Sequence, residues 1–316
     1  YYHKVTDGTL LNMTPAPSSS YSTVVFNIAK IRNQGLEFDI HGDFIRKKDF
    51  RWTGNLNISR NVSKVLDING GPFSDPNDRD AMNLGTSVVK EGEPLGLLYG
   101  RVATGIIKTQ AQLEAAREEF SLWTIFDPYL NLGDIAYEYE DGFWKEDVIG
   151  HATPDFFGGY TNTINWNRFT LTALFTFSYG NDLIYQKDVS DSGMSSLANR
   201  GTRVLNHYSE DNTSSNRPRS MWATTYMLSS LNVYDASYLK LKTLSLSYNL
   251  PESICRKVRI KSASVYGTAT NVFTITSYPG PDPEVSDDPT SVIGGGRDVS
   301  TYPTVKSYTF GIRINF

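Results

Sequence analysis

The last nine residues, 308–316, constrain the fold of this chain more than any other segment. Apolar and non-apolar side chains alternate there without a break. Successive side chains of a β-strand point to opposite faces, so this period of two places every apolar member on one face, whereas a helix would scatter them around its circumference. The segment therefore predicts an amphipathic strand that ends on an aromatic residue. Its apolar members are Tyr308, Phe310, Ile312, Ile314 and Phe316.

The same alternation recurs upstream and predicts several antiparallel hairpins. Residues 169–179 alternate over eleven positions, residues 160–166 alternate before them, and Asn167 and Arg168 supply a short turn, so 157–180 is predicted to be a hairpin. Residues 36–41 and 52–59 form a second pair around a charged turn at 46–49. Two more alternating runs, 244–250 and 262–269, flank Pro251.

The links between these strands fall into two classes. The links at 46–49, 167–168 and 251–258 are short, whereas 67–93, 108–155, 181–236 and 278–303 are long and polar. Antiparallel membrane barrels have this asymmetry, with short turns on the inner side and long loops outside. Within the second long link, residues 109–120 predict a short surface helix, because Thr109 can cap a run of strong helix formers.

Alternation alone is also compatible with a soluble β-sandwich, which would act as a binding module. Three features favour a membrane barrel: strands near eleven residues long, aromatic residues at strand ends such as Trp166, Phe169 and Tyr179, and the terminal Phe316. The mean hydropathy of −0.35 is compatible with a barrel, because only alternate residues of each strand face lipid.

Composition excludes several other classes of function. The net charge is −4 without a basic stripe, so nucleic-acid binding is not expected. Cys255 is the single cysteine and permits no internal disulfide. The four histidines stand in no metal-ligand spacing, and the chain contains no Gly-x-Ser-x-Gly motif, so we do not expect an enzyme.

Several segments, taken in order, resemble the SusC/RagA family of TonB-dependent outer-membrane transporters from Bacteroidota. The resemblance runs through almost the whole chain and matches the C-terminal portion of the family's barrel. It rests on the collinear order of short motifs at 27–39, 93–107, 133–135, 148–159, 235–251, 265–273, 282–284 and 302–303.

The resemblance implies an all-β fold, an antiparallel transmembrane barrel of about 22 strands that is plugged by an N-terminal domain. Residues 1–316 would be its C-terminal strands and long extracellular loops, about eight to ten strands, with the plug and the first strands lying elsewhere. The strand formed by residues 308–316 would then serve as a barrel assembly signal.

The resemblance further implies import of an oligosaccharide or a peptide across the outer membrane of a Gram-negative bacterium. A SusD-like surface lipoprotein would cap the loops, TonB would supply energy through the plug, and outer-membrane lipid would surround the strands. An alternative from another class is a small self-contained barrel that acts as an adhesin or an enzyme, because eight strands can close by themselves.

No cofactor is expected. Many family members have an Asp-rich, calcium-like loop where this chain has residues 137–147. Two of the three oxygen ligands that an EF-hand-type loop needs before Gly142 are replaced by Tyr137 and Tyr139, and only Asp141 remains, so a solvated acidic loop is the preferred interpretation.

Ligand contacts are expected in the long loops and on the inner side of the strands. Aromatic side chains of the loops are candidates for stacking on sugar rings or peptide side chains, although each could equally pack within its own loop. The candidates are Tyr129, Tyr139, Phe143, Trp144 and Trp222. The sequence does not say whether the ligand is a glycan or a peptide.

Overall fold

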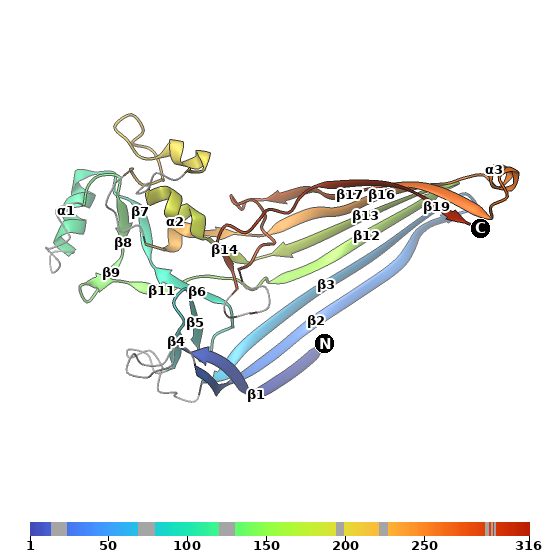
Figure 1. Cartoon of the computed structure of the whole chain (residues 1–316). Coiled ribbons are helices and arrows are strands. Elements are labelled where there is room, and N and C mark those ends of the chain that lie inside the picture. Colours follow the sequence, from blue (N-terminus) through green and yellow to red (C-terminus); the bar gives the residue numbers. More distant parts are fainter. Residues whose placement is uncertain are drawn as a thin grey trace.

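One long antiparallel sheet dominates the computed structural model, and shorter elements gather beyond one of its ends (Figure 1). The structure describes residues 1–13, 24–68, 80–119, 130–193, 199–220, 227–287, 291, 293 and 295–316. Eight strands make up the sheet, in the order β1, β2, β3, β12, β13, β16, β17 and β19. Their bounds are β1 (Tyr2–Met13), β2 (Val24–Lys47), β3 (Phe50–Asp67), β12 (Phe156–Trp166), β13 (Phe169–Tyr179), β16 (Tyr238–Asn249), β17 (Ser262–Thr276) and β19 (Ser307–Asn315).

The strand register sorts the side chains into a polar face and an apolar face. One row across the six strands from β3 to β19 consists entirely of hydroxyl residues, and within it the Ser245 and Thr268 hydroxyls lie 2.9 Å apart. Neighbouring residues of a strand point to opposite faces, so the adjacent row lies on the other face of the sheet. The residues of that adjacent row are mostly apolar. The hydroxyl row is Thr53, Thr163, Thr172, Ser245, Thr268 and Thr309, and the adjacent row is Trp52, Ile164, Leu171, Leu246, Gly267 and Phe310.

The apolar face of the sheet is left uncovered by the described part of the chain. Phe310 is 83% exposed and Ile312 is 68% exposed. The clusters of buried apolar residues lie instead at one end of the sheet, for example where Ile31 and Val65 pack with Val89. A sheet whose outward side chains are apolar and unpacked is what a lipid-facing barrel wall presents.

No helix in the described residues is long and apolar enough to cross a membrane.

The end of the sheet with the short connections, here called the turn end, also holds the C-terminus (Figure 1). Trp166 pairs with Phe169 across a two-residue turn, and Asn167 there has a φ of 51°, a left-handed conformation that Asn tolerates well. The link between β16 and β17 contains helix α3 (Glu252–Lys257), which buries Cys255.

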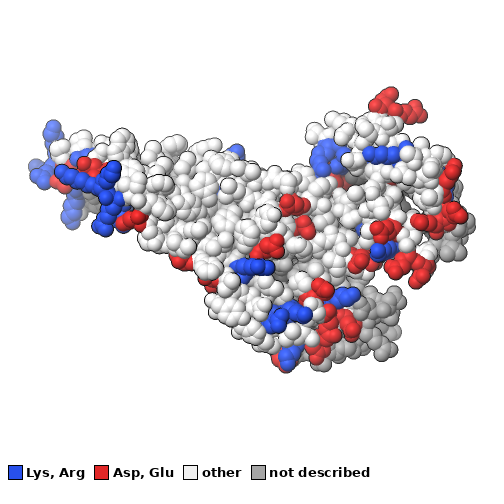
Figure 2. Space-filling view, turned by 180° about the vertical axis from the view of Figure 1, so that it is seen from behind, with Lys and Arg blue, Asp and Glu red and all other residues white. Residues whose placement is uncertain are grey.

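The turn end is strongly basic. Residues 46–51, 167–168 and 251–261 together carry nine Lys or Arg and two Asp or Glu, although the whole chain has a net charge of −4. Figure 2 shows these basic side chains gathered at the narrow end of the molecule, opposite the folded loops. The rest of the chain is therefore net acidic.

The opposite end, here called the loop end, carries small sheets and helices built from the long links. A four-stranded sheet, a three-stranded sheet and two two-stranded sheets form there. The remaining elements are β4 (Ala81–Asn83), β5 (Ser87–Lys90), β6 (Leu97–Arg101), β7 (Ala103–Ile106), α1 (Gln110–Glu119), β8 (Ile135–Tyr137), β9 (Tyr139–Glu140), β10 (Phe143–Trp144), β11 (Glu146–His151), β14 (Asp182–Tyr185), α2 (Gln186–Gly193), η3 (Thr202–Asn206), η4 (Ser230–Asn232), β15 (Val233–Asp235) and β18 (Arg297–Asp298).

The predicted hairpins and the predicted helix at 109–120 are confirmed, but the expected strand lengths near eleven residues are wrong for one hairpin. β2 has 24 residues and β3 has 18. Their loop-end parts continue past the alternating segments and bury Ala29, Ile31 and Val65 against the small sheet of β4 and β5. Tertiary packing, rather than alternation, extends these strands.

The sheet is open in the described structure. β1 and β19 are its two edge strands, and no described residues of the two pair with each other. The eight strands thus do not close into the small self-contained barrel considered above.

A matched pair of substitutions in β19 tests the sidedness of the sheet. Ile312→Lys places a charge on the apolar face and is expected to cost about 2–4 kcal/mol near the membrane midplane, lowering the yield of folded, membrane-inserted protein. Thr309→Lys, on the hydroxyl-lined face, is expected to have little effect. Heat-modifiable mobility on gels and the amount of protein in outer-membrane fractions measure the folded yield of each variant. Equal losses of yield for the two variants would contradict the assignment of the apolar face to lipid.

Candidate ligand-binding site at the loop end

A cavity of about 430 Å³ lies among the elements of the loop end. Its walls come from segments far apart in sequence: β8, α2, η3, residues 216–218 and the stretch around η4 and β15. The lining combines polar and charged residues with aliphatic ones. The lining residues are Ile135, Asp188, Val189, Arg203, Asn206, Asn216, Arg217, Pro218, Met227, Leu231, Asn232 and Tyr234.

Asp188 organises the polar part of the lining. Its Oδ1 accepts a 2.7 Å hydrogen bond from Nη2 of Arg217 and a longer one of 3.5 Å from Nη1 of Arg203. Its Oδ2 accepts a 2.6 Å hydrogen bond from the Tyr234 hydroxyl. Burial and the Asp188 carboxylate raise the pKa of Tyr234, so this hydroxyl stays protonated and continues to donate.

Arg203 is the cation of this cavity that remains accessible. Its side chain is 39% exposed, whereas those of Arg217 and Asp188 are 13% and 6% exposed. The guanidinium lies over the Tyr234 ring, 5.3 Å from the centroid, and Nη2 donates to the Tyr234 hydroxyl at 3.3 Å. Burial lowers the pKa of Arg203, but Tyr234 and Asp188 outweigh this and raise it, so the group stays charged. Two cations and one carboxylate leave the lining net positive.

Two asparagines of the lining have their amide orientation set by neighbouring donors. The Asn216 Oδ1 accepts a 2.8 Å bond from the Lys108 ammonium, which can only donate. The Asn206 Oδ1 accepts a 2.9 Å bond from the amide nitrogen of Asn212, and the same nitrogen donates to the His207 carbonyl. Both carbonyl oxygens are therefore engaged, and each amide keeps its NH₂ group as a donor.

A third asparagine repeats this arrangement. The Asn232 Oδ1 accepts from the backbone N–H of Ser229 at 3.1 Å. None of the side-chain amide nitrogens of Asn206, Asn216 and Asn232 has a hydrogen-bond partner within the parts of the chain that the structure describes. The polar part of the lining is thus rich in donors and is suited to a ligand that accepts hydrogen bonds.

The motif at residues 133–135 forms one edge of the cavity. Gly133 has a φ of +90°, and a Cβ there would lie 2.4 Å from the Tyr208 ring, so the position requires glycine. Asp134 is buried and accepts two hydrogen bonds from the Arg219 guanidinium, at 2.8 and 3.1 Å. These bonds join the turn to the residue that follows the lining segment 216–218. Burial raises the pKa of Asp134 despite the nearby Arg219. Ile135 then enters the lining.

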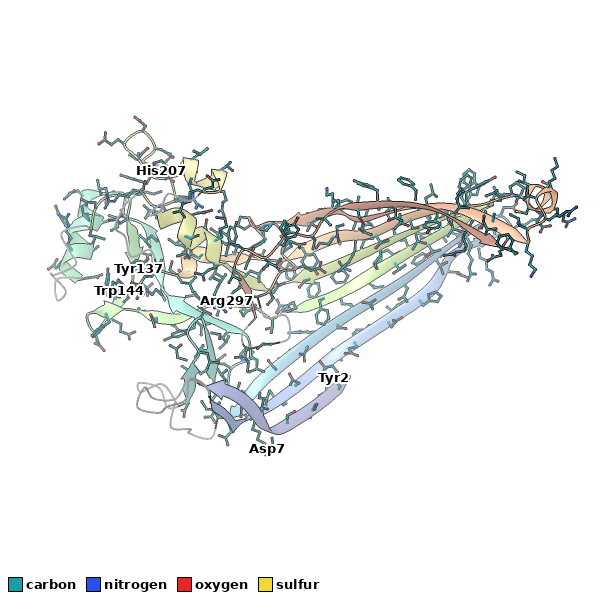
Figure 3. The ribbon with its side chains drawn as sticks, in the orientation of Figure 1. Tyr2, Asp7, Tyr137, Trp144, His207 and Arg297 are labelled. Atoms are coloured by element: carbon teal, nitrogen blue, oxygen red, sulfur yellow. The ribbon has the colours of Figure 1, made fainter. Side chains whose placement is uncertain are left out.

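None of the predicted aromatic candidates that the structure describes lines this cavity. Tyr139, Phe143 and Trp144 lie in the β9–β10 hairpin, and Trp144 is labelled at the loop end in Figure 3, as are Tyr137 and His207. Arg101 covers the Trp144 ring at 4.2 Å from the centroid, while Phe143 is 60% exposed. Ligand stacking at these three residues stays a prediction. Tyr129 and Trp222 fall outside the described residues.

The acidic stretch at 137–147 folds as a β-hairpin. Glu140 pairs with Phe143 across a turn whose central residues, Asp141 and Gly142, have φ values of 51° and 80°. Asp-Gly is a preferred pair for such two-residue turns, because both positions need positive φ. Glu138 pairs with Lys145 at 3.0 Å. Within the described residues, no group of three or more His, Cys, Asp or Glu side chains is placed to hold a metal ion.

A second polar cluster, here called the latch, fastens the last long loop onto the sheet. Lys240 of β16 is 1% exposed and contacts the Asp282 carboxylate at 2.9 and 3.1 Å and Glu284 at 2.7 Å. Lys242, which is 43% exposed, reaches Glu284 at 3.0 Å. The Thr304 hydroxyl also donates to Asp282. These contacts hold the described parts of the last loop around Asp282, Glu284 and Thr304 against β16.

Sequence reasoning missed the residues that matter most in these two clusters. Asp188, Arg203 and Arg217 belong to no recognisable motif and meet only through tertiary folding. Lys240 carried no distinguishing signal either: it stands at a polar position of an alternating run, as the exposed Lys242 does. Only the structure shows that Lys240 is buried and that acidic partners satisfy it.

In sequence, the chain is similar to several proteins named TonB-dependent receptors. It is 31% identical over 323 residues to the TonB-dependent receptor P3 of Formosa agariphila. This match covers all of this chain and 32% of that protein. It is 24% identical over 336 residues to the TonB-dependent receptor SusC of Bacteroides thetaiotaomicron, covering all of this chain and 29% of SusC. The chain therefore spans about a third of the length of these relatives. No protein-family model matches it.

Solved structures show the same fold. The RagAB peptide transporter matches with a TM-score of 0.75 at 22% identity, over 99% of this chain and 32% of that one. The RagAB peptide importer in its closed-closed state gives the same TM-score. The SusC/RagA resemblance and the all-β antiparallel fold predicted from sequence are confirmed, and the relatives carry the names of receptors and transporters rather than enzymes.

Removing the buried lysine of the latch should release the last loop. Lys240→Met leaves Asp282 buried without its cation, and breaking a buried pair in this way typically costs about 3–5 kcal/mol. Lys242→Met removes only an exposed contact to Glu284 and should cost less than about 1 kcal/mol. Limited proteolysis within residues 277–306 measures release, and equal cleavage of both variants would show that Lys240 does not fasten the loop.

The latch should also open in acid. Burial raises the pKa values of Asp282 and Glu284, but bonds from Thr304, Lys240 and Lys242 outweigh it and hold both pKa values below the ordinary 3.8 and 4.5. A lowered folded-state pKa contributes stability above the ordinary value, and this is lost as pH falls below it. Proteolytic release of the loop should therefore rise below about pH 4 in the wild type. Lys240→Met should lose this dependence, and a pH-independent wild type would contradict the assignment.

Proposed function

We propose that this chain, a SusC/RagA-like part of a TonB-dependent transporter, forms one wall and the outer loops of an importer in the outer membrane. One observation carries the proposal: an eight-stranded antiparallel sheet has an uncovered apolar face, a hydroxyl-lined opposite face, and folded loops at one end only. The apolar face suits lipid, and the hydroxyl face suits a water-filled or plugged lumen.

Residues 1–316 are, in this proposal, the C-terminal strands and loops of a larger barrel. The open edges at β1 and β19 support this, since an unpaired strand edge cannot persist in lipid. The length of the relatives supports it too, because the chain spans only about a third of them. A plug and further strands would complete the barrel, and β19 with its terminal Phe316 would serve as the assembly signal.

The transported ligand is an oligosaccharide or a peptide, and the protein works in a Bacteroidota-like outer membrane. A structural neighbour described as a peptide transporter supports the peptide, and the oligosaccharide follows from the SusC/RagA resemblance. By the same resemblance, a SusD-like lipoprotein covers the loop end and TonB supplies the energy. The loop end faces the exterior and the turn end faces the periplasm, as short turns do in such barrels.

Uptake by intact cells tests this function. Deletion of the gene that encodes the chain is expected to abolish accumulation of labelled oligopeptides or of labelled oligosaccharides, and deletion of TonB should have the same effect. Re-expression of the wild-type protein should restore accumulation, which controls for other effects of the deletion. Unchanged accumulation of both ligand classes in the deletion strain, or recovery of the protein in soluble form without detergent, would overturn the proposal.

A further inference from the structure

We infer that the loop-end cavity recognises the terminal carboxylate of a short peptide, with Arg203 and three asparagine amides as donors and the aliphatic lining residues holding the last side chain. This inference rests on the proposed import function and names the ligand chemistry of its outer site. The arguments come from the charge, the donors, the shape and the aromatic content of the cavity.

The charge of the lining favours an anion. The ionisable groups that line the cavity are Asp188, Arg203, Arg217 and Tyr234, and the tyrosine is neutral. Asp188 is already satisfied by the short bonds from Arg217 and Tyr234, at 2.7 and 2.6 Å. Arg203, by contrast, makes only long bonds, at 3.5 and 3.3 Å, and is 39% exposed. Its guanidinium can therefore present further N–H donors to a carboxylate.

The three asparagines add donors without adding acceptors. Lys108 fixes Asn216, Asn212 fixes Asn206, and Ser229 fixes Asn232, each by binding the side-chain carbonyl oxygen. The NH₂ groups then remain for the ligand. A carboxylate accepts up to about four hydrogen bonds, so a guanidinium with neighbouring amides matches its capacity. A neutral sugar hydroxyl would need acceptors as well as donors.

The remaining lining residues suit an aliphatic or small apolar side chain. The cavity volume of about 430 Å³ lies within the ordinary range for small-molecule sites. Among the described residues of the lining, only Tyr234 is aromatic; Arg203 lies over its ring, and Tyr185 forms a T-shaped contact with it at 6.5 Å between ring centroids. The described lining therefore gives a pyranose ring little aromatic surface on which to stack. The apolar lining consists of Ile135, Val189, Pro218, Met227 and Leu231.

The decisive experiment compares two peptides that differ at one group. The complete transporter that contains this chain, purified in detergent, is titrated with a short peptide bearing a free C-terminus and with the same peptide amidated. We expect amidation to weaken binding by about tenfold or more, which corresponds to the loss of one charge-assisted contact. Arg203→Gln should weaken binding of the free acid by a similar factor and leave the amide nearly unchanged.

A second variant and a matched control keep the test independent of folding. Asn216→Asp preserves the contact with Lys108 but replaces the NH₂ donor by a negative charge, so it should weaken the free acid more than the amide. Arg256→Gln changes an exposed arginine at the turn end, far from the cavity, and should alter neither affinity. Heat-modifiable mobility confirms that each variant is folded.

The outcomes separate this inference from the function on which it rests. Equal affinity for acid and amide overturns the inference while import stands. Binding of a uronic-acid oligosaccharide in preference to either peptide, with the same dependence on Arg203, keeps the carboxylate site and overturns the peptide. Absence of binding together with absence of uptake of either ligand class overturns the proposed function itself.

Discussion

The alternating register of the long sheet is the constraint on which the rest of the structure depends. The ladder pairs the backbone of neighbouring strands, and a slip of one residue in any strand would carry its apolar side chains to the hydroxyl-lined face. The row from Thr53 to Thr309 crosses six strands without interruption, which shows that the six registers agree. Only with this agreement does one face suit lipid and the other suit an aqueous interior.

Charged contacts, together with clusters of buried apolar residues, organise the loops above this sheet. Lys240 binds the last long loop to β16, Arg219 binds Asp134, and Asp188 gathers Arg203 with Arg217. Each contact joins segments that are distant in sequence, and each leaves a buried carboxylate satisfied by a cation. Of these contacts, those of Asp188 with Arg203 and Arg217 lie in the lining of the loop-end cavity and join three of its segments.

The sheet was largely predictable from sequence, whereas the candidate site was not. Alternation at residues 157–180 and 308–316 revealed strands, faces and turns, because a side-chain period of two has a single structural meaning. Alternation underestimated the length of β2, because the first part of this strand packs against loop-end elements and that packing is not visible as an alternating pattern in the sequence. The acidic stretch around Asp141 was approached as an altered cation loop, yet its Asp-Gly pair marks a hairpin turn.

By itself, then, the sequence determined the sheet, its two faces and the family resemblance, since these depend on local periodicity and on motifs kept in chain order. Tertiary structure alone decided which loop residues meet. Arg203 and Asn216 are thirteen residues apart, and Asp188 and Tyr234 are 46 residues apart, yet all four line one cavity. No local pattern encodes such a meeting, because it is set by long-range ion pairs and by backbone turns such as the one at Gly133.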